Sequence, residues 1–151
     1  MDEKTAGTFF SLFNEIGIIN QIGTTFLEAR LPDGLIAPHF SVLNHLIRVQ
    51  DGQTPIRLAQ AFQVPKNSMT HTLAGLERRG LVQMRPNPDD ARSKQVWITP
   101  AGRDLRVRTI ANMIPLFEEF EQTIALDRVT ELLPRLREIR EFVDELRDHR
   151  T

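Results

Sequence analysis

The chain has 151 residues, of which 40% are hydrophobic, and a formal net charge of −1, which suits one ordinary hydrophobic core with helical arms. Because it contains no cysteine, disulfides, thiolate metal sites and cysteine-based redox sensing are excluded. The first five residues are polar and no apolar run approaches the roughly 18 residues of a membrane span, so we expect a cytoplasmic protein without a membrane partner.

An N-terminal helix is predicted from Thr8 to Leu31. Apolar side chains recur there at steps of three and four residues, the spacing of one helix face. They are Phe9, Leu12, Phe13, Ile16, Ile19, Ile22 and Phe26. The turn sequence at 31–34 then ends the helix, because its proline cannot continue one.

Two shorter helices should follow. The first opens at Pro38, ends at Asp51-Gly52, and is expected to turn four apolar side chains inward: Phe40, Leu43, Leu46 and Ile47. Thr54 then has the character of an N-cap, and Pro55 suits the first position of the next helix.

A further helix is predicted from Pro65 to Arg79, with Gly80 as its left-handed C-cap. Met69, Leu73 and Leu76 share one face by helical spacing and should pack inward. Polar residues fall on or near the opposite face of its N-terminal half, namely Lys66, Asn67, Ser68, Thr70 and His71. Such side chains can donate to purine edges, contact phosphates or pack a methyl group on thymine.

Residues 81–85 and 95–99 alternate and are rich in branched and aromatic side chains, which predicts a β-hairpin. Its loop, 88–94, carries Asp90 two residues before Arg92, so we expect the carboxylate to brace the loop while Arg92 and Lys94 project from the tip. Trp97 should anchor the hairpin to the body. Thr99 and a proline directly after it then start another helix.

This order of helices and hairpin is the layout of a winged helix-turn-helix, which reads double-stranded DNA with a helix in the major groove and a basic hairpin beside it. The segment 38–103 carries nine basic and four acidic residues, whereas the remainder carries ten basic and sixteen acidic. Positive charge is therefore concentrated where the layout places DNA. The predicted DNA-binding residues are Arg57, Lys66, Asn67, Ser68, Thr70, His71, Arg85, Asp90, Arg92 and Lys94.

The C-terminal region should form two apolar-striped helices, one from Arg103 with a kink at Pro115, and a last one with Pro134 as a kink or a first-turn residue. Large exposed apolar stripes are rare on monomers. We therefore expect residues 1–37 and 104–151 to be dimerisation helices around the DNA-binding region 38–103. The alternative is that the arms pack on each other within one subunit. The expected fold class is mainly α with a small β-hairpin wing.

The chain resembles the MarR family of bacterial transcription regulators between Pro38 and Leu105. The resemblance lies in an ordered set of segments, 39–43, 58–59, 73–82, 90–92 and 98–102. It implies a homodimer, a palindromic operator, and often a small-molecule effector that releases the DNA. We expect the protein to act as a repressor. The resemblance also implies base contacts from the N-terminal half of the helix at 65–79 and a wing contact from Arg92 with Asp90. Pro65 departs from the acidic or hydroxyl residue of many members, which puts a first-turn phosphate contact in doubt.

By the same resemblance, an effector pocket would lie between the terminal helices and the DNA-reading body, where Phe13, Phe40 and Phe117 are candidate lining residues. The alternative for each phenylalanine is plain core. Because cysteine is absent, any sensing would use small-molecule binding.

An enzyme is not expected, nor a metal or other cofactor. The four histidines, His39, His45, His71 and His149, are scattered, and neither a glycine-rich phosphate loop nor an elbow serine occurs. Asp89 and Asp90 are adjacent carboxylates on an exposed turn, a poor acid–base pair. The alternative function is a winged-helix protein-interaction or ligand-binding module without DNA affinity. A continuous positive stripe from Arg57 through Lys66 to Arg92 and Lys94 would favour DNA.

Overall fold

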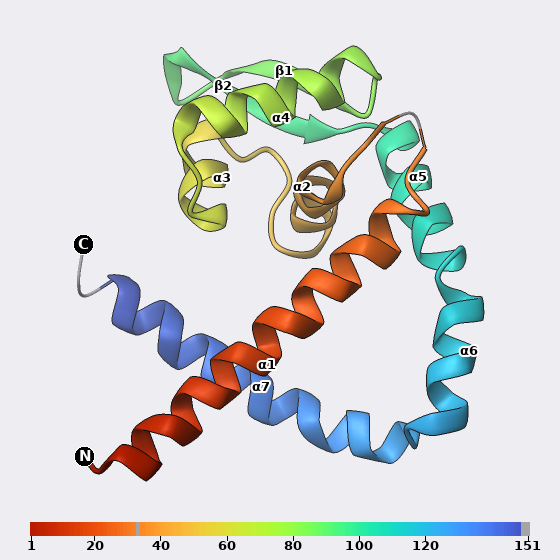
Figure 1. Cartoon of the computed structure of the whole chain (residues 1–151). Helices are drawn as coiled ribbons and strands as arrows, with labels where there is room; N and C mark the ends of the chain where they lie inside the picture. Colours follow the sequence, from red (N-terminus) through yellow and green to blue (C-terminus); the bar gives the residue numbers. More distant parts are fainter. Residues whose placement is uncertain (33, 149–151) are drawn as a thin grey trace. The chain divides into compact units, whose positions relative to one another are not determined.

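The computed structural model describes residues 1–32 and 34–148 (Figure 1). Its elements in chain order are α1 (Glu3–Glu28), α2 (Ala37–Arg48), α3 (Pro55–Phe62), α4 (Lys66–Arg78), β1 (Val82–Asn87), β2 (Asp90–Ile98), α5 (Pro100–Ala111), α6 (Ile114–Thr123) and α7 (Leu126–Asp148). The chain divides into two compact units, Met1–Met113 and the residues from Ile114 onward. Asp33, part of the predicted turn, lies outside the described residues.

Helices α2 to α5 and the hairpin share one apolar core, and we call this part of the first unit (residues 35–111) the head. The core comprises Leu35, Val42, Leu43, Leu46, Leu58, Ala59, Met69, Leu73, Leu76, Leu81, Val82, Val96, Ile98 and Leu105. Burial of one such leucine or valine side chain stabilises the folded state by about 1.5–3 kcal/mol. The three apolar side chains of α4 predicted to face inward all belong to this core, so its opposite face is turned to solvent.

The side of α2 that faces the core begins at His39 and continues through Val42, Leu43 and Leu46, at the helical spacing of three, four and seven residues. Phe40, also predicted to face inward, lies one position off this row and is only half-buried. Ile47 is likewise half-buried at the edge of the core.

Local capping fixes the helix starts around the turn. The Thr54 hydroxyl accepts a hydrogen bond from the Arg57 amide at 3.4 Å, and that of Thr99 accepts one from Gly102 at 3.1 Å, which confirms both N-caps. α4 begins at Lys66, with Pro65 as its N-cap, and ends at Arg78, one residue inside each predicted bound. Gly80 has φ +67° after it, as the left-handed C-cap requires.

The strands of the hairpin are longer than predicted, and only Pro88 and Asp89 remain in the turn. Pairing shifts near the tip, where Pro86 lies opposite Lys94 and Asn87 opposite Asp90. Residues 91–93 therefore form a bulge in β2, because Pro86 has no amide hydrogen with which to continue the ladder. The prediction that Asp90, Arg92 and Lys94 lie in a loop is wrong, since all three belong to β2.

The segment before α3 adds a short bridge to the hairpin, in which Gln53 pairs with Val96. Asp51 fixes the same place, because its Oδ1 accepts hydrogen bonds from the Ile98 amide at 2.9 Å and the Gly52 amide at 3.1 Å, and its Oδ2 pairs with Arg103 at 3.0 Å. Trp97 packs directly on this segment, since a Cβ on Gly52 would lie 2.5 Å from its ring. The hairpin is thus anchored to the body, as predicted for Trp97.

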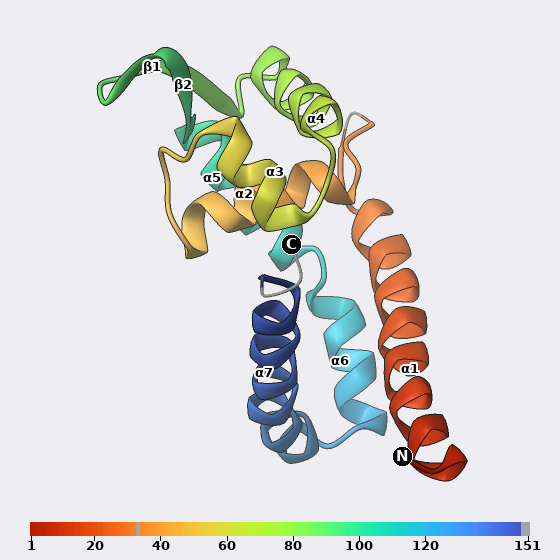
Figure 2. The same cartoon turned by 90° about the vertical axis from the view of Figure 1, so that its left-hand side faces the viewer.

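α1 extends from the head as a single helix (Figures 1 and 2). It starts at Glu3, earlier than predicted, because the Asp2 carboxylate caps the Thr5 amide at 2.7 Å. Its last turns meet the head, where the Glu28 carboxylate accepts from the Ala37 amide at 2.8 Å. Arg30 follows and donates to the carbonyls of Phe26 at 2.8 Å and Asn112 at 2.9 Å. No side chain of α1 is buried.

The second unit consists of α6 and α7. α5 ends at Ala111 and α6 starts at Ile114, so the kink predicted at Pro115 is instead a break between two helices, with the proline in the first turn of the second. Pro134 lies inside α7, well past its first turn. None of the described side chains of these two helices is buried. The exposed ones include Phe117, Phe120 and Phe142.

Candidate nucleic-acid interface

The outer face of α4 carries the five polar residues singled out by the sequence, and all five are exposed: Lys66, Asn67, Ser68, Thr70 and His71. The Thr70 hydroxyl donates to the Lys66 carbonyl at 2.9 Å, which satisfies its hydrogen within the helix. Its methyl group and oxygen lone pairs are left for an outside partner. The face presents mixed donors and acceptors at the N-terminal end of the helix, where helix-turn-helix proteins contact base edges.

A groove of about 630 Å³ lies between the first turn of α3, the first turn of α4 and the hairpin. Its lining includes four cationic side chains, Arg57, Lys66, Arg92 and Lys94, beside the single carboxylate of Asp90. These are the four cations whose arrangement as a continuous stripe would favour DNA over a protein-interaction module. Cations that converge in a concave surface beside an exposed polar helix create a local field that attracts a polyanion.

The remaining residues of this groove were not predicted by sequence reasoning: Thr54, Pro55, Ile56, Gln60, Met84, Asn87 and Ser93. Gln60 was detectable, because it stands three residues after Arg57 on the solvent side of α3. Asn87 and Ser93 had no such signal, since the bulge near the tip brings them together and its register is not encoded locally.

The hairpin bulge is tied by a chain of hydrogen bonds. Asp90 Oδ1 accepts from the Arg92 amide at 3.0 Å and lies 3.4 Å from Arg92 Nε, so the expected brace is present. Asn87 Nδ2 donates to Ser93 Oγ at 2.8 Å, and this hydroxyl donates to the Asp90 carbonyl at 3.1 Å. The Arg92 side chain is 93% exposed. An ion pair so exposed is worth at most about 1 kcal/mol and leaves the guanidinium available to a phosphate.

Arg85 is not among the residues that line this groove. Its guanidinium lies over the Trp97 ring, 5.2 Å from the centroid, and donates to Gln83 Oε1 at 3.3 and 3.4 Å. The structure therefore brings together five of the ten predicted DNA-binding residues in the groove and four more on α4 beside it, and leaves Arg85 outside the groove, in the middle of β1 opposite Gln95.

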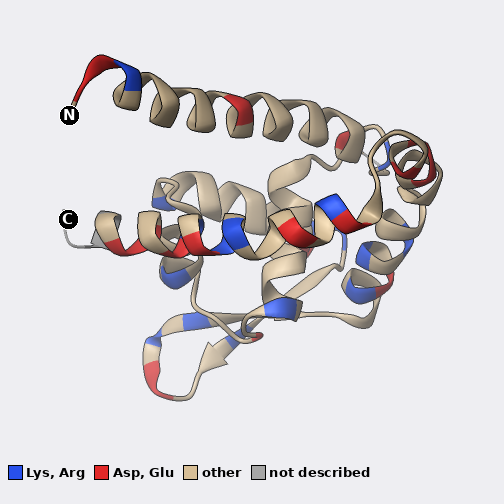
Figure 3. Cartoon of the chain, turned by 90° about the horizontal axis from the view of Figure 1, so that it is seen from below, with Lys and Arg blue, Asp and Glu red and all other residues tan. Residues whose placement is uncertain are grey.

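Charges are distributed unevenly along the chain (Figure 3). The hairpin carries several cationic positions and α7 carries both signs, whereas α1 is almost uncharged along its length. Within residues 1–32 and 34–148, no group of three or more histidine or acidic side chains could hold a metal ion. His149 lies outside these residues. No helix in the described part of the chain is long and apolar enough to cross a membrane.

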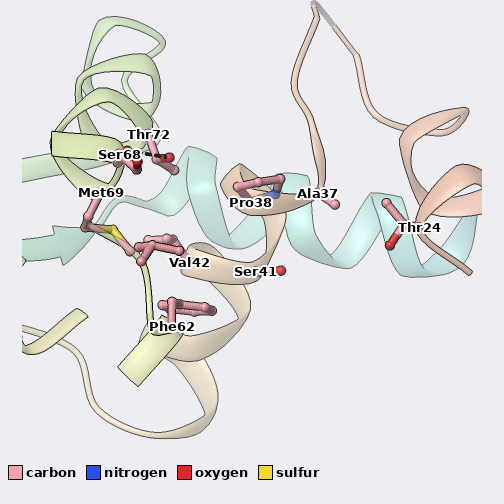
Figure 4. Close-up of a pocket in the computed structure, with 10 residues that line it drawn as sticks. Thr24, Ala37, Pro38, Ser41, Val42, Phe62, Ser68, Met69 and Thr72 are labelled. Carbon is pink, nitrogen blue, oxygen red and sulfur yellow. Dashed lines mark hydrogen bonds between the residues drawn. The ribbon is translucent and has the colours of Figure 1, made fainter. Parts of the chain in front are cut away.

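The three phenylalanines predicted for an effector pocket belong to three different helices. Phe13 is 54% exposed on α1, Phe40 is half-buried on α2, and Phe117 is 49% exposed on α6 in the second unit. A cavity of about 400 Å³ opens in the first unit, lined by other residues of α1, α2, α3 and α4 and of the turn before α4 (Figure 4).

Comparison with known proteins agrees with this geometry. A MarR family model matches residues 33–93. The transcriptional regulator HosA of Escherichia coli O111:H- is 30% identical over 108 residues, which cover 72% of this chain and 78% of HosA. The chain belongs to the MarR family.

Further relatives of this MarR-family protein are more distant or only partly aligned. The transcriptional activatory protein BadR of Rhodopseudomonas palustris is 32% identical over 97 residues, 63% of this chain, and the match spans only about half (54%) of BadR. A mutant of Escherichia coli MarR, solved in complex with operator DNA, is 25% identical, with a TM-score of 0.71 over 85% of this chain and 95% of MarR.

Membership confirms the resemblance and the winged helix-turn-helix fold. The MarR-family protein is a DNA-binding transcriptional regulator, and its family and relatives are regulators rather than enzymes. The matched residues run from just before α2 into the hairpin and contain every predicted DNA-binding residue except Lys94.

Proposed function

We propose that two copies of this chain form a cytoplasmic homodimer that binds a palindromic operator and represses transcription. The observation that carries the proposal is the groove beside α4, where Arg57, Lys66, Arg92 and Lys94 converge. In this arrangement α4 enters the major groove, and the hairpin lies along the neighbouring backbone or enters the minor groove.

Each part of the interface has a distinct role. Asn67, Ser68, Thr70 and His71 face base edges from α4, where an amide or imidazole discriminates between base pairs by about 1–3 kcal/mol per good contact. Lys66 and Arg57 neutralise phosphates on either side of the turn. Arg92, held by Asp90, approaches the narrow minor groove that attracts arginine, with Lys94 beside it. Arg85, exposed in the middle of β1 and stacked on Trp97, contacts the phosphate backbone.

Dimerisation would use the uncovered apolar helices of both units. α1 exposes Phe9, Phe13, Ile16, Ile19 and Ile22, and α7 exposes Val129, Leu132, Leu133, Phe142 and Val143. Exposure of such apolar faces to water is unfavourable, and contact with a second copy of the chain would bury them. A two-fold axis then places the two α4 helices about 34–36 Å apart, one turn of DNA, on a palindrome. The operator complex of Escherichia coli MarR supports this use of the fold.

Salt dependence of binding tests the proposal. The promoter fragment that flanks the protein's own gene is titrated with the protein at several KCl concentrations, and binding is followed by fluorescence anisotropy. If each subunit engages its four groove cations, log K against log salt concentration has a slope of about −7. A folded dimer that retains no fragment at low salt would refute DNA binding. A promoter–reporter assay decides the direction, and a rise in transcription on adding the protein would overturn repression.

Release by a small molecule completes the proposal. Phe13, Phe40 and Phe117 remain proposed effector-pocket residues by resemblance. A thermal-shift screen in the presence and absence of operator DNA identifies compounds that stabilise the protein and weaken its DNA complex, as linkage requires.

A further inference from the structure

The hairpin carries a row of polar side chains that runs from the body of the head toward its tip. Trp97, Gln95 and Ser93 occupy alternate positions of β2, on the face opposite to the core residues Val96 and Ile98. The row continues with Asn87 at the end of β1 and Asp90 at the start of β2. All of these polar side chains are half-buried, so water replaces a lost partner only in part.

Hydrogen bonds join the row into one series, which we call the hairpin relay (Trp97, Gln95, Asn87, Ser93 and Asp90). Trp97 Nε1 donates to Gln95 Oε1 at 3.3 Å, and Gln95 Nε2 donates to Asn87 Oδ1 at 3.4 Å. Asn87 Nδ2 donates to Ser93 Oγ at 2.8 Å, and this hydroxyl donates to the Asp90 carbonyl at 3.1 Å. The relay therefore ends at the residue whose carboxylate braces the wing arginine.

The orientation of each amide in the relay is fixed from both ends. An indole N–H can only donate, so Gln95 turns its oxygen toward Trp97 and its NH2 group toward Asn87. The backbone amide of Asp89 also donates to Asn87 Oδ1, at 3.1 Å, which again requires an oxygen there and leaves the NH2 group for Ser93. One orientation of Gln95 and Asn87 thus satisfies all of these bonds together.

The relay spans the place where the backbone ladder of the hairpin is irregular. The register shifts between Pro86 and Asn87, so backbone hydrogen bonds hold the tip less regularly than the rest of the hairpin. The other end of the relay is fixed, because the Trp97 ring packs on Gly52, whose amide donates to the Val96 carbonyl at 3.0 Å. Side chains therefore connect the tip to the body across the irregular part of the ladder.

The members of the relay differ in their access to DNA. Asn87, Asp90 and Ser93 line the cationic groove, whereas Gln95 and Trp97 are not among its lining residues. A change at Gln95 or Trp97 can therefore reach the groove only through the rest of the hairpin.

We propose that Gln95 and Trp97 are positioning residues for the DNA contact of Arg92. Through the relay they hold the bulge from which Arg92 projects, so this arginine has fewer conformations to lose when it meets the duplex. Neither residue touches DNA itself. The inference rests on the proposed DNA-binding function, whereas the relay exists in the free protein.

The relay is tested first without DNA. Because Trp97 is the only tryptophan, its indole N–H gives a single signal, and NMR saturation transfer measures the exchange of this hydrogen with water. Asn87→Ala should speed the exchange about fivefold, since the Gln95 amide loses its partner and holds the indole less firmly. Asp89→Ala is the matched control, because Asp89 contributes its backbone amide to the relay, and the exchange should stay unchanged.

Equal exchange in the wild type and Asn87→Ala would overturn the relay. Equal acceleration in Asn87→Ala and Asp89→Ala would overturn it as well, because the tip would then be loosened without regard to the hydrogen bonds.

A double-mutant cycle then measures the coupling to Arg92. Gln95→Met keeps the length of the side chain and removes its amide. Fluorescence anisotropy gives the affinity for the operator fragment. Gln95→Met should weaken binding about tenfold in the wild-type background and less than about twofold in the Arg92→Ala background. Gln83→Met is the matched control on β1, because Gln83 accepts from Arg85 and lies outside the relay, so its effect should be the same in both backgrounds.

A loss of affinity from Gln95→Met that is equally large in both backgrounds would overturn the positioning role. A Gln95→Met protein that binds the operator like the wild type would also overturn it. Trp97→Phe keeps a ring against Gly52 and removes the donor, and it repeats the cycle if Gln95→Met fails to fold. If the wild type binds no DNA at low salt, the proposed function has failed while the indole exchange still decides the relay.

Discussion

At the scale of single residues, the clearest functional arrangement is the pair formed by Asp90 and Arg92. The carboxylate holds the backbone amide and the Nε of Arg92, while the rest of the arginine side chain stands 93% exposed. The exposed pair adds little to the stability of the fold. Its effect is to reduce the number of conformations that the arginine must give up when it meets DNA.

Arg92→Ala should therefore weaken operator binding without unfolding the protein. Because each subunit of the variant neutralises one phosphate fewer, the slope of log K against log salt concentration should become shallower by about 2. Fluorescence anisotropy across a KCl series measures both quantities. Arg92→Lys is the control, because it keeps the charge and hence most of the slope. An unchanged slope in Arg92→Ala would remove Arg92 from the interface.

His39 is a second residue with a measurable consequence. Burial lowers its pKa below the ordinary value of 6.5, and the charges of Arg79, directly after α4, and of His71 on α4 lower it further. Its Nδ1 accepts the Ile36 amide hydrogen at 3.1 Å, which requires the neutral ring. Below pH 6.5 the unfolded chain takes up a proton that the folded chain resists, so folding stability should fall as pH drops from about 6.5.

Urea denaturation between pH 5 and 8 tests this prediction. His39→Asn keeps an acceptor near Nδ1 and cannot titrate, so its stability should depend less on pH over the same interval. A wild-type dependence identical to that of His39→Asn would show that other groups control acid sensitivity.

At the scale of elements, the segment between α2 and α3 sets the position of the hairpin. Gln53 pairs with Val96, Trp97 packs on Gly52, and Asp51 accepts the Ile98 amide while pairing with Arg103. Strand β2 and helix α5 thus both contact this loop. The groove depends on this junction, because Arg92 and Lys94 belong to the strand that it holds.

Asp51→Ala should destabilise the head by about 1–3 kcal/mol, because the half-buried amide of Ile98 loses its acceptor. Asp51→Asn should cost less, since an amide oxygen can still accept that hydrogen bond and the partly exposed pair with Arg103 contributes at most about 1 kcal/mol. Urea denaturation gives both values. Equal losses in the two variants would assign the effect to the ion pair instead.

Elements governed by neighbouring residues were predictable from sequence, and those governed by distant contacts were not. The caps at Thr54 and Thr99 and the left-handed Gly80 follow from residue chemistry within a few positions. The bulge at 91–93 depends on cross-strand register, and the Asp51–Ile98 hydrogen bond joins residues 47 apart in sequence. The groove follows the same division. Its cations were predicted from residue type, whereas Asn87 and Ser93 are brought together only by the cross-strand register and were not predicted.

At the scale of the whole molecule, each unit exposes apolar helices that its own core does not cover. Neither α1 nor α6 buries a side chain. On α1, large apolar side chains are at least 37% exposed, namely those of Phe9, Phe13, Ile16, Ile19 and Ile22. The head, by contrast, has a core of its own. The proposed dimer interface and the DNA-binding surface are therefore built from different helices.

Ile19→Glu should shift the protein from dimer to monomer, because it places a charge on a side chain that is 66% exposed in the isolated chain and would be covered in the dimer. Sedimentation velocity measures the assembly, and operator affinity should fall with it. Gln21→Glu, also on exposed α1, adds the same charge and should leave the dimer intact if it lies off the dimer face. A dimer that tolerates Ile19→Glu would exclude this face of α1.

Arg30 has a consequence for how such regulators diverge. One guanidinium clamps the end of α1 to the end of α5, with donors to Phe26 and Asn112. The inclination of the long first helix to the head is therefore set by a few contacts at its last turns, those of Arg30 and Glu28 among them, rather than by a broad packed surface. Substitution of Arg30 would change the inclination of α1 to the head. In a dimer it would thereby alter the preferred distance between operator half-sites, while the bases read within each half-site stay the same.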